Sequence, residues 1–182
     1  MAFTFEPLAI PDVVKITPEV FGDDRGFFLE LFKSEPFTEA GLATQFVQFN
    51  VSKSQGGVVR GLHYQLKPHA QGKLVTVVRG EIFDVAVDIR RGSPHFGSWV
   101  SVTLSAEDHT MVYVPPGFAH GFAVMSEAAE VIYYITKQYA PDQERGILWN
   151  DPTVGITWPV TSPILSAKDQ AYPVLAEAEI NF

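Results

Sequence analysis

The sequence of 182 residues predicts an all-β fold, a sandwich or barrel with a few short helices. In the stretch 83–89, apolar residues alternate with Asp84, Ala86 and Asp88, and a period of two is typical of a strand. Other short apolar runs follow at regular intervals, separated by glycine and proline, which is typical of sandwiches and barrels. Helix signals are confined to two short stretches.

The strands are expected in order along the chain. The first is the apolar stretch 3–10, which would present an exposed edge in a monomer. The runs 74–78 and 83–89 are joined across Arg79-Gly80, which predicts a hairpin turn between two paired strands. The remaining strand candidates are 100–104, 111–114, 122–125 and 131–136.

Two short helices are expected. The first has Ser34 as its N-cap and Pro36 in its first turn, and it should end near Gly41. The second begins near Ser166. The stretch 149–163 is rich in turn residues and is expected to cover one end of the barrel.

Composition limits the classes of function. Apolar residues make up 46% and charged residues 19%, which is typical of a folded domain, and no repeat or linker divides residues 1–182. No apolar run approaches the roughly 20 residues of a membrane helix, and no secretory signal is expected. A net charge of −8 argues against nucleic acid as a partner, although a local basic cluster can still bind a small anion.

The absence of cysteine removes disulfides, thiolate catalysis and cysteine-bound zinc from consideration. It also agrees with a cytoplasmic location, which we expect for this protein. The sequence lacks a glycine-rich dinucleotide fingerprint, so no redox cofactor is expected.

The segment Arg60-Gly61-Leu62-His63 is the first candidate for chemistry. A histidine in a strand is more often structural than catalytic. Here, however, Arg60 precedes His63 closely and Lys73 follows it, so a base and two cations lie within a short stretch. This grouping favours a functional role for His63.

The segment from Pro115 to His120 has the pattern P-x-G-x-x-H, which resembles the second motif of the cupin superfamily. Its simpler interpretation is a Pro-Gly turn with a histidine at the edge. Many cupins bind metal through an H-x-H pair, but Gln65 stands where the second histidine would be. A reduced site of His63, His120 and Glu81 is an alternative, since three such ligands can hold a metal, but we expect none.

Tyr133 and Tyr134 are adjacent in a predicted strand, so their side chains face opposite sides. One should point into the barrel and the other should pack outside it. Alternation alone does not decide which is which. The turn at Asp23-Asp24-Arg25-Gly26 precedes an aromatic-rich strand, and Arg25 is either solvated or available to a phosphate.

Taken together and in order, these motifs resemble the dTDP-4-dehydrorhamnose 3,5-epimerase family over nearly the whole chain. The matching stretches are 23–30, 48–52, 60–65, 71–75, 83–88, 116–122, 139–141, 149–151 and 166–169.

The resemblance implies a cupin-type jelly-roll barrel that forms a homodimer with N-terminal strands crossing to the partner. It implies a dTDP-linked 4-keto-6-deoxyhexose as substrate and epimerisation at C3 and C5. His63 would be the base, Asp169 its hydrogen-bonded partner, Tyr133 the acid on the opposite face, and Lys73 the group that stabilises the enolate. The substrate-binding positions implied are Arg25, Phe28, Glu30, Gln48, Asn50, Arg60, Lys73, His120, Tyr139, Glu144 and Lys168.

Several alternatives remain at this point. Tyr134 and Thr76 stand where close relatives often have lysine and arginine, which leaves the sugar specificity open. The enzyme could epimerise C3 or C5 alone, or act as a 3,4-ketoisomerase. A metal-dependent cupin oxygenase and a non-catalytic sugar-binding cupin are the more distant alternatives.

Overall fold

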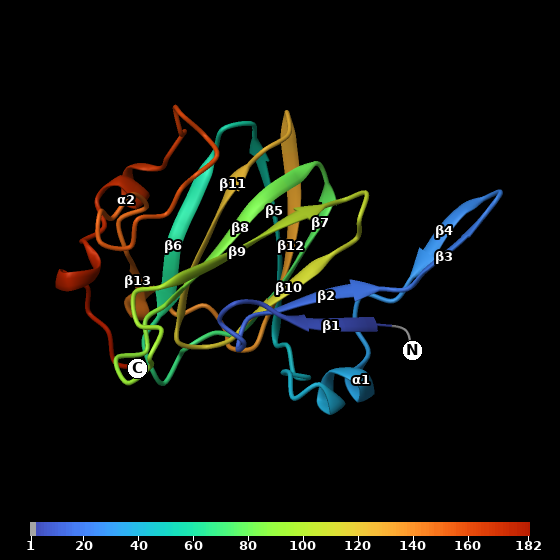
Figure 1. Ribbon diagram of the computed structural model, residues 1–182, viewed down its shortest axis with the longest axis horizontal. Helices are drawn as coiled ribbons and strands as arrows, with labels where there is room; N and C mark the ends of the chain where they lie inside the picture. Colours follow the sequence, from blue (N-terminus) through green and yellow to red (C-terminus); the bar gives the residue numbers. More distant parts are fainter. Residues whose placement is uncertain (1–2) are drawn as a thin grey trace.

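Two antiparallel sheets face each other in the computed structural model, which describes residues 3–182 (Figure 1). The first sheet has six strands in the order β1-β2-β10-β7-β12-β5, so β1 and β5 form its edges. Its strands are β1 (Phe3–Pro7), β2 (Val14–Pro18), β10 (Met111–Val114), β7 (Lys73–Arg79), β12 (Ala128–Ile135) and β5 (Gln48–Gln55).

The second sheet has five strands in the order β13-β6-β11-β8-β9. Its strands are β13 (Glu144–Gly146), β6 (Val59–Gln65), β11 (Phe118–Val124), β8 (Glu81–Asp88) and β9 (Trp99–Ser105). The predicted strands all appear, with β11 beginning four residues earlier than the expected start at Phe122. This arrangement confirms the all-β fold with short helices.

The hairpin predicted at Arg79-Gly80 is wrong. β7 belongs to the six-stranded sheet and β8 to the five-stranded sheet, so the chain crosses between sheets at this turn. Gly80 has a φ of +75°, and a Cβ there would lie 2.0 Å from the carbonyl oxygen of Ala128. A tight turn is therefore present, but it exchanges sheets, as consecutive strands of a jelly roll do.

The alternation in β8 has an unusual orientation. Ile82 and Ala86 belong to the apolar cluster between the sheets, so Asp84, which lies between them in the alternation, also faces the interior. Val85 and Val87 instead belong to an outer cluster that the C-terminal part of the chain covers. Asp84 and Asp88 are therefore buried on the inward face of this strand rather than exposed to solvent.

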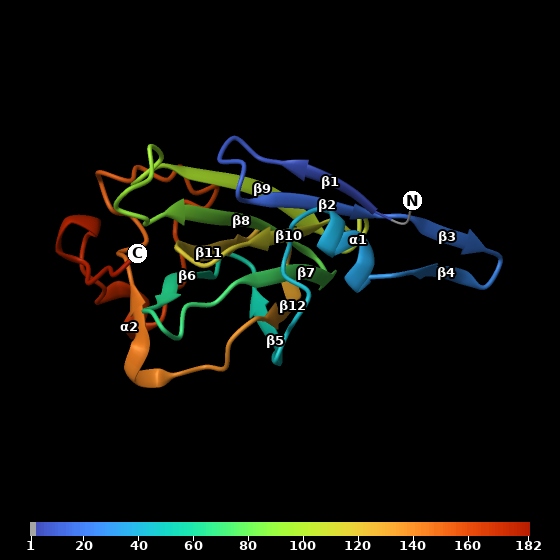
Figure 2. The ribbon, with the colours of Figure 1, turned by 90° about the horizontal axis from the view of Figure 1, so that it is seen from below.

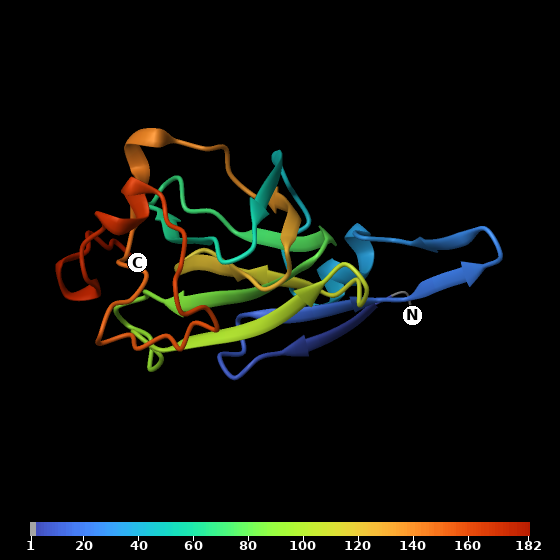
Figure 3. The same ribbon diagram turned by 90° about the horizontal axis from the view of Figure 1, so that it is seen from above.

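The sequence predicted that the turn-rich stretch 149–163 would cover one end of the barrel, and this prediction is wrong. The stretch covers the outer face of the five-stranded sheet instead. Val154, Ile156 and Trp158 pack in the outer cluster, and the rings of Trp158 and Phe83 are 6.3 Å apart. Figure 3 shows this C-terminal part of the chain, in orange and red, lying against one side of the molecule.

A third, two-stranded sheet stands apart from the barrel. It is the hairpin of β3 (Val20–Asp23) and β4 (Gly26–Leu29), joined by the turn predicted from sequence. All views show it projecting well beyond the other strands (Figures 1, 2 and 3). The Phe27 ring packs on His109 with 4.4 Å between ring centroids.

The helices are short. α1 (Ser34–Glu39) has Lys33 at its N-cap with no side-chain hydrogen bond, so the prediction of Ser34 as N-cap is wrong; burial of Phe37 holds the helix instead. α2 (Ala167–Gln170) begins as predicted, because Ser166 Oγ accepts the Asp169 N–H at 3.0 Å. Two 3₁₀ turns are η1 (Pro141–Gln143) and η2 (Leu175–Glu177). In residues 3–182, no helix has the length and apolar character that crossing a membrane requires.

Candidate active site

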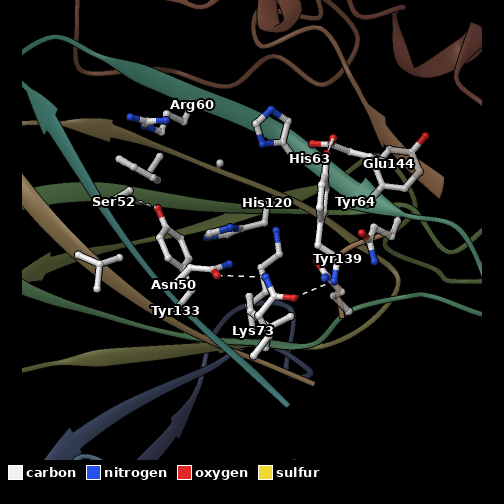
Figure 4. A pocket seen from close by; sticks show the side chains of 17 residues that line it. Asn50, Ser52, Arg60, His63, Tyr64, Lys73, His120, Tyr133, Tyr139 and Glu144 are labelled. Carbon is white, nitrogen blue, oxygen red and sulfur yellow. Dashed lines mark hydrogen bonds between the residues drawn. The ribbon is translucent and has the colours of Figure 1, made fainter. Parts of the chain in front are cut away.

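A cavity of about 360 Å³ opens between the two sheets, and strands of both sheets supply its walls (Figure 4). Nine of the predicted site residues line it: Gln48, Asn50, Arg60, His63, Lys73, His120, Tyr133, Tyr139 and Glu144. The structure therefore brings together most of the positions that the sequence indicated, from strands widely separated along the chain.

His63 lies on β6 and is paired with Asp169 of α2. Its Nε2 is 2.5 Å from Asp169 Oδ1, and Ser166 Oγ donates to the other carboxylate oxygen at 2.8 Å. Burial alone would raise the pKa of Asp169, but hydrogen bonds from His63 and Ser166 outweigh it and hold that pKa below its usual value. An ionised Asp169 fixes the proton on Nε2, which leaves Nδ1 as the basic nitrogen.

Close packing fixes the ring of His63 as well. The Tyr172 ring lies edge-on to it with 5.7 Å between centroids. Gly146 pairs with His63 across β13 and β6, and a Cβ on this glycine would lie 2.4 Å from the Tyr172 ring. Glycine at this position therefore leaves the space that Tyr172 occupies. Tyr172 was not identified from the sequence.

Tyr133 and Tyr134 face opposite sides of β12. Tyr133 lines the cavity and its hydroxyl lies 3.0 Å from Ser52 Oγ, whereas Tyr134 packs edge-on against Phe49 outside the cavity. Burial raises the pKa of Tyr133 to about 12, so this hydroxyl keeps its proton at neutral pH. Tyr133 is thus a proton donor in the wall opposite the sheet that carries His63.

Lys73 begins β7 and lines the cavity without an ion-pair partner within residues 3–182. Burial lowers its pKa to about 8, and the negative charges of Asp84 and Glu144 oppose that shift. The ammonium group is therefore the main form at pH 7, and it is free to meet a negative charge on a ligand.

His120 on β11 lies directly opposite His63 on β6 in the strand register. Its Nε2 lies 2.8 Å from Asp84 Oδ2, and both residues are buried. The cavity thus contains two histidines, each bound to its own carboxylate. Asp84 was seen in the sequence only as part of the β8 alternation and was not assigned to the site.

The rim of the cavity carries a network of polar groups. Glu144 accepts the Tyr139 hydroxyl at 2.6 Å and also pairs with Lys168, which stands outside the cavity lining. Gln48 donates to Asn50 at 3.0 Å and accepts the Tyr139 N–H at 2.8 Å. Separately, Arg60 Nε donates to Ser54 Oγ at 2.9 Å.

Three predicted binding residues lie away from the cavity. Arg25 and Phe28 belong to the projecting hairpin, where Arg25 pairs with Asp23 and Phe28 is 65% exposed. Glu30 follows the hairpin and lies 3.9 Å from Lys33. Within one chain, these positions do not reach the site, because the hairpin extends beyond the barrel.

Sequence reasoning also missed several lining residues, among them Ser52 and Gln65. Gln48, Asn50 and Ser52 follow one another at a spacing of two on β5, and this spacing could have identified Ser52 from its neighbours.

The alternative metal site does not assemble. His63 and His120 lie side by side, but Glu81 stands at the start of β8 and outside the cavity lining. Among the residues that the structure describes, no three histidine, aspartate or glutamate side chains converge as a metal site requires.

The cavity of this jelly-roll barrel holds a carboxylate-bound histidine, an un-ionised tyrosine and a lysine without an ion-pair partner among residues 3–182. These groups define a class of enzyme that moves protons at carbon. Comparison with known proteins agrees with this class. The model of the dTDP-4-dehydrorhamnose 3,5-epimerase family matches residues 7–177. The chain belongs to this family.

Individual relatives agree in both sequence and structure. A dTDP-4-dehydrorhamnose 3,5-epimerase of Shigella flexneri is 58% identical over 88% of this chain and 89% of the relative. The crystal structure of a 3,5-epimerase from Legionella pneumophila, in complex with dTDP-4-keto-L-rhamnose, has a TM-score of 0.92 and 46% identity, covering 96% of this chain and 94% of that one. A dTDP-4-dehydrorhamnose 3-epimerase of Streptomyces niveus is 43% identical over 94% of this chain and 84% of the relative.

Proposed function

We propose that the protein epimerises dTDP-4-dehydro-6-deoxy-D-glucose at both C3 and C5, giving dTDP-4-dehydro-L-rhamnose. The observation that carries this proposal is that His63 and Tyr133 face one cavity from different sheets. Inversion at carbon requires one group to take a proton from one side of the sugar and another to return a proton from the other side. Two groups on opposite walls meet this requirement.

The first step is proton removal next to the ketone. The 4-carbonyl acidifies the C–H bonds at C3 and C5, and His63 Nδ1 takes one of these protons, with the imidazolium stabilised by Asp169. The electron pair of the broken C–H bond moves onto the carbonyl oxygen and gives an enolate.

Lys73 is the group that we assign to the enolate. A preorganised charged donor directed at developing negative charge typically contributes about 3–4 kcal/mol to catalysis. Tyr133 then returns a proton to carbon from the opposite face, and the same sequence at the second carbon completes the reaction. Every step is a proton transfer, so the reaction consumes neither oxidant nor reductant.

We assign the nucleotide diphosphate to the polar side of the cavity. Arg60 would pair with a phosphate, since a guanidinium binds phosphate oxygens bidentately. Gln48 and Asn50 supply amides at the rim, Tyr139 a hydroxyl and Glu144 a carboxylate, with His120 toward the sugar. Lys168 would contribute through its contact with Glu144.

We further propose a homodimer in which the projecting hairpin of a second copy supplies Arg25, Phe28 and Glu30 to this site. The hairpin carries exposed aromatic rings, and edge strand β5 exposes Phe49 and Val51 (64% and 70%). Exposed apolar edges of this kind are usually covered by a partner. Light scattering should give twice the chain mass of 20.1 kDa; a monomer at micromolar concentration would contradict the proposal.

Epimerisation at a single carbon is the second candidate, because a 3-epimerase is among the relatives. The identity to a 3,5-epimerase is higher, which favours reaction at both carbons. The test is to incubate the protein with dTDP-4-keto-6-deoxyglucose in D₂O and follow deuterium by NMR. Label at C3 and C5 is expected; label at one carbon would establish a mono-epimerase, and none would refute the class.

A metal-dependent reaction is tested separately. We expect activity to survive exhaustive treatment with EDTA, because His63 and His120 have carboxylate partners of their own and no third ligand joins them. Loss of activity that a divalent metal restores would contradict this expectation.

We also propose that residues 1–182 act as one epimerase domain and that the protein is cytoplasmic. The cysteine-free sequence supports the second point, since a reducing compartment places no demand on disulfides. Cell fractionation with an antibody against the protein tests the location.

A further inference from the structure

We propose that Asp84 is a positioning residue for this reaction: its buried carboxylate orients His120 toward the cavity and keeps Lys73 in the ammonium form. The proposal rests on the proposed function, in which Lys73 meets the enolate. Asp84 itself does not line the cavity, so it would act through the two residues that do.

The strand register explains how Asp84 reaches His120. Ala86 of β8 lies opposite His120, and Phe122 lies opposite Asp84. Asp84 and His120 are therefore diagonal neighbours on the interior face of the sheet, within reach of long side chains. The resulting contact, 2.8 Å between Nε2 and Oδ2, fixes the ring and leaves Nδ1 for the cavity.

The burial of Asp84 is costly for a purely structural residue. Its side chain is 2% exposed, and His120 is the one side chain in the described part of the protein that hydrogen-bonds it. A carboxylate can accept about four hydrogen bonds, and an under-bonded buried carboxylate destabilises the fold unless positive charge lies nearby. Lys73 is such a charge: Asp84 and Glu144 both act on it electrostatically, and it forms no ion pair within residues 3–182.

Asp84 lies on β8 and Lys73 on β7, in the two facing sheets, and the charge of Asp84 acts on Lys73 without an ion pair between them. Burial favours the neutral amine, and Asp84 is the larger of two negative charges that favour the ammonium. A neutral amine would lose the charge-assisted hydrogen bond to the enolate. The titratable and charged groups around Lys73 are Asp84, which acts on it from β8, and the cavity-lining residues His120, His63, Arg60, Tyr133, Tyr139 and Glu144.

The test compares Asp84→Asn with the wild type. Asparagine keeps the shape and can still accept the His120 N–H, but it removes the charge. With ¹³Cε-labelled lysine, and the Lys73 signal assigned through Lys73→Arg, the NMR titration midpoint of Lys73 should fall by about one pH unit or more. The alkaline limb of kcat/KM should move to lower pH by a similar amount, with kcat at pH 8 falling about fivefold and KM changing little.

Asp88→Asn is the matched control. Asp88 is a second buried aspartate on the same face of β8, but it is bound by Arg90 and lies away from the cavity. This variant should lose stability without moving either titration. A folded Asp84→Asn protein whose Lys73 titrates as in the wild type would overturn the proposal.

The proposal can also be tested if Asp84→Asn does not fold or if the wild type proves inactive. If Asp84→Asn does not fold, Asp84→Ser serves instead, because it also removes the charge and leaves a smaller hydroxyl acceptor for His120: the Lys73 midpoint should fall in the same way, and an unchanged midpoint would overturn the proposal. The lysine titration needs no substrate. It therefore reports on Asp84 even if the wild type fails to exchange protons in D₂O, which would refute the proposed function alone.

Discussion

At the scale of single residues, the tautomer and orientation of His63 are set by a carboxylate from a distant part of the chain. Asp169 binds Nε2, and its own orientation depends on Ser166 in the N-cap of α2. The base that we propose is thus prepared before substrate arrives, because the tautomer and the ring plane of His63 are both fixed.

His63→Ala should abolish exchange at both carbons while dTDP-sugar binding persists, since no second base is assigned. Asp169→Asn should slow exchange by about 10²- to 10⁴-fold without abolishing it, because the tautomer is disturbed while the imidazole remains. Deuterium incorporation measured by NMR gives both rates. His95→Ala, outside this cavity, is the control, and wild-type exchange in His63→Ala would exclude His63 as the base.

Tyr133 and Tyr134 provide a matched pair. Tyr133→Phe should still exchange substrate protons with solvent but should form little inverted product, because the acid on the second face is missing. Tyr134→Phe should be much milder, since that ring packs on Phe49 outside the cavity. Exchange and inversion are measured separately; the reverse pattern would show that the acid is misassigned.

The sequence predicted much of the site, for reasons that differ between residues. His63, Lys73 and Arg60 were found from local grouping, whereas Tyr133 was selected over Tyr134 only by resemblance to a family. Asp84 was not predicted as a site residue, because an aspartate in an alternating strand normally faces solvent. Its inward orientation depends on the C-terminal segment that covers the outer face, which no local pattern reveals.

At the scale of elements, the sequence located most strands but not their partners, and it did not predict β2, β3, β5 or β13. Arg79-Gly80 has the composition of a hairpin turn, yet its flanking strands enter different sheets. Turn chemistry fixes the local bend, while the packing of both sheets decides which strands pair. For the same reason, the pattern of β3 and β4 predicted a turn without predicting that the hairpin would project from the barrel.

The projecting hairpin leads to a prediction on nucleotide binding. Phe28→Ala should weaken the binding of dTDP about tenfold, because stacking of a base on an aromatic ring contributes about 1–3 kcal/mol. Isothermal titration calorimetry measures this, with Phe96→Ala as the control because its partly exposed ring lies near Arg91 in a distant loop. Unchanged affinity in Phe28→Ala would contradict a role for the hairpin in the site.

At the scale of the whole molecule, one ionic network ties the N-terminal strands to the five-stranded sheet. Arg90 pairs with Asp88, which is buried, and with Asp12, which precedes β2. Hydrogen bonds from Arg90 lower the pKa of Asp12. Burial alone would raise the pKa of Asp88, but bonds from Arg90 and Ser93 outweigh it and lower that pKa too.

Arg90→Gln should therefore reduce the free energy of unfolding by about 2–4 kcal/mol at pH 7, since it leaves a buried carboxylate unpaired. Both aspartates have lowered pKa values in the fold, so their contribution is complete above their unfolded pKa of about 3.9 and is lost as pH falls through the native values. The loss of unfolding free energy in Arg90→Gln should therefore become smaller below pH 4.

Urea unfolding at pH 7 and pH 3.5, at one fixed protein concentration, measures this deficit. The neighbouring Arg91→Gln is the control, because Arg91 lies over the Phe96 ring and has no ion pair among residues 3–182. Two results would contradict the role of Arg90 as the partner of Asp88 and Asp12. One is an equal loss of stability in both variants, and the other is a loss of stability in Arg90→Gln that does not depend on pH.

The pairing of His63 with Asp169 also has a consequence for biosynthesis. The two residues are 106 positions apart, and a ribosome adding about 5–20 residues per second takes about 5–20 s to cover that distance. Throughout that interval the nascent chain holds His63 without the carboxylate that fixes its tautomer. Full activity therefore requires the C-terminal segment to emerge and pack on the barrel, so a translation product that stops before Asp169 should act on the sugar nucleotide pool no faster than Asp169→Asn does.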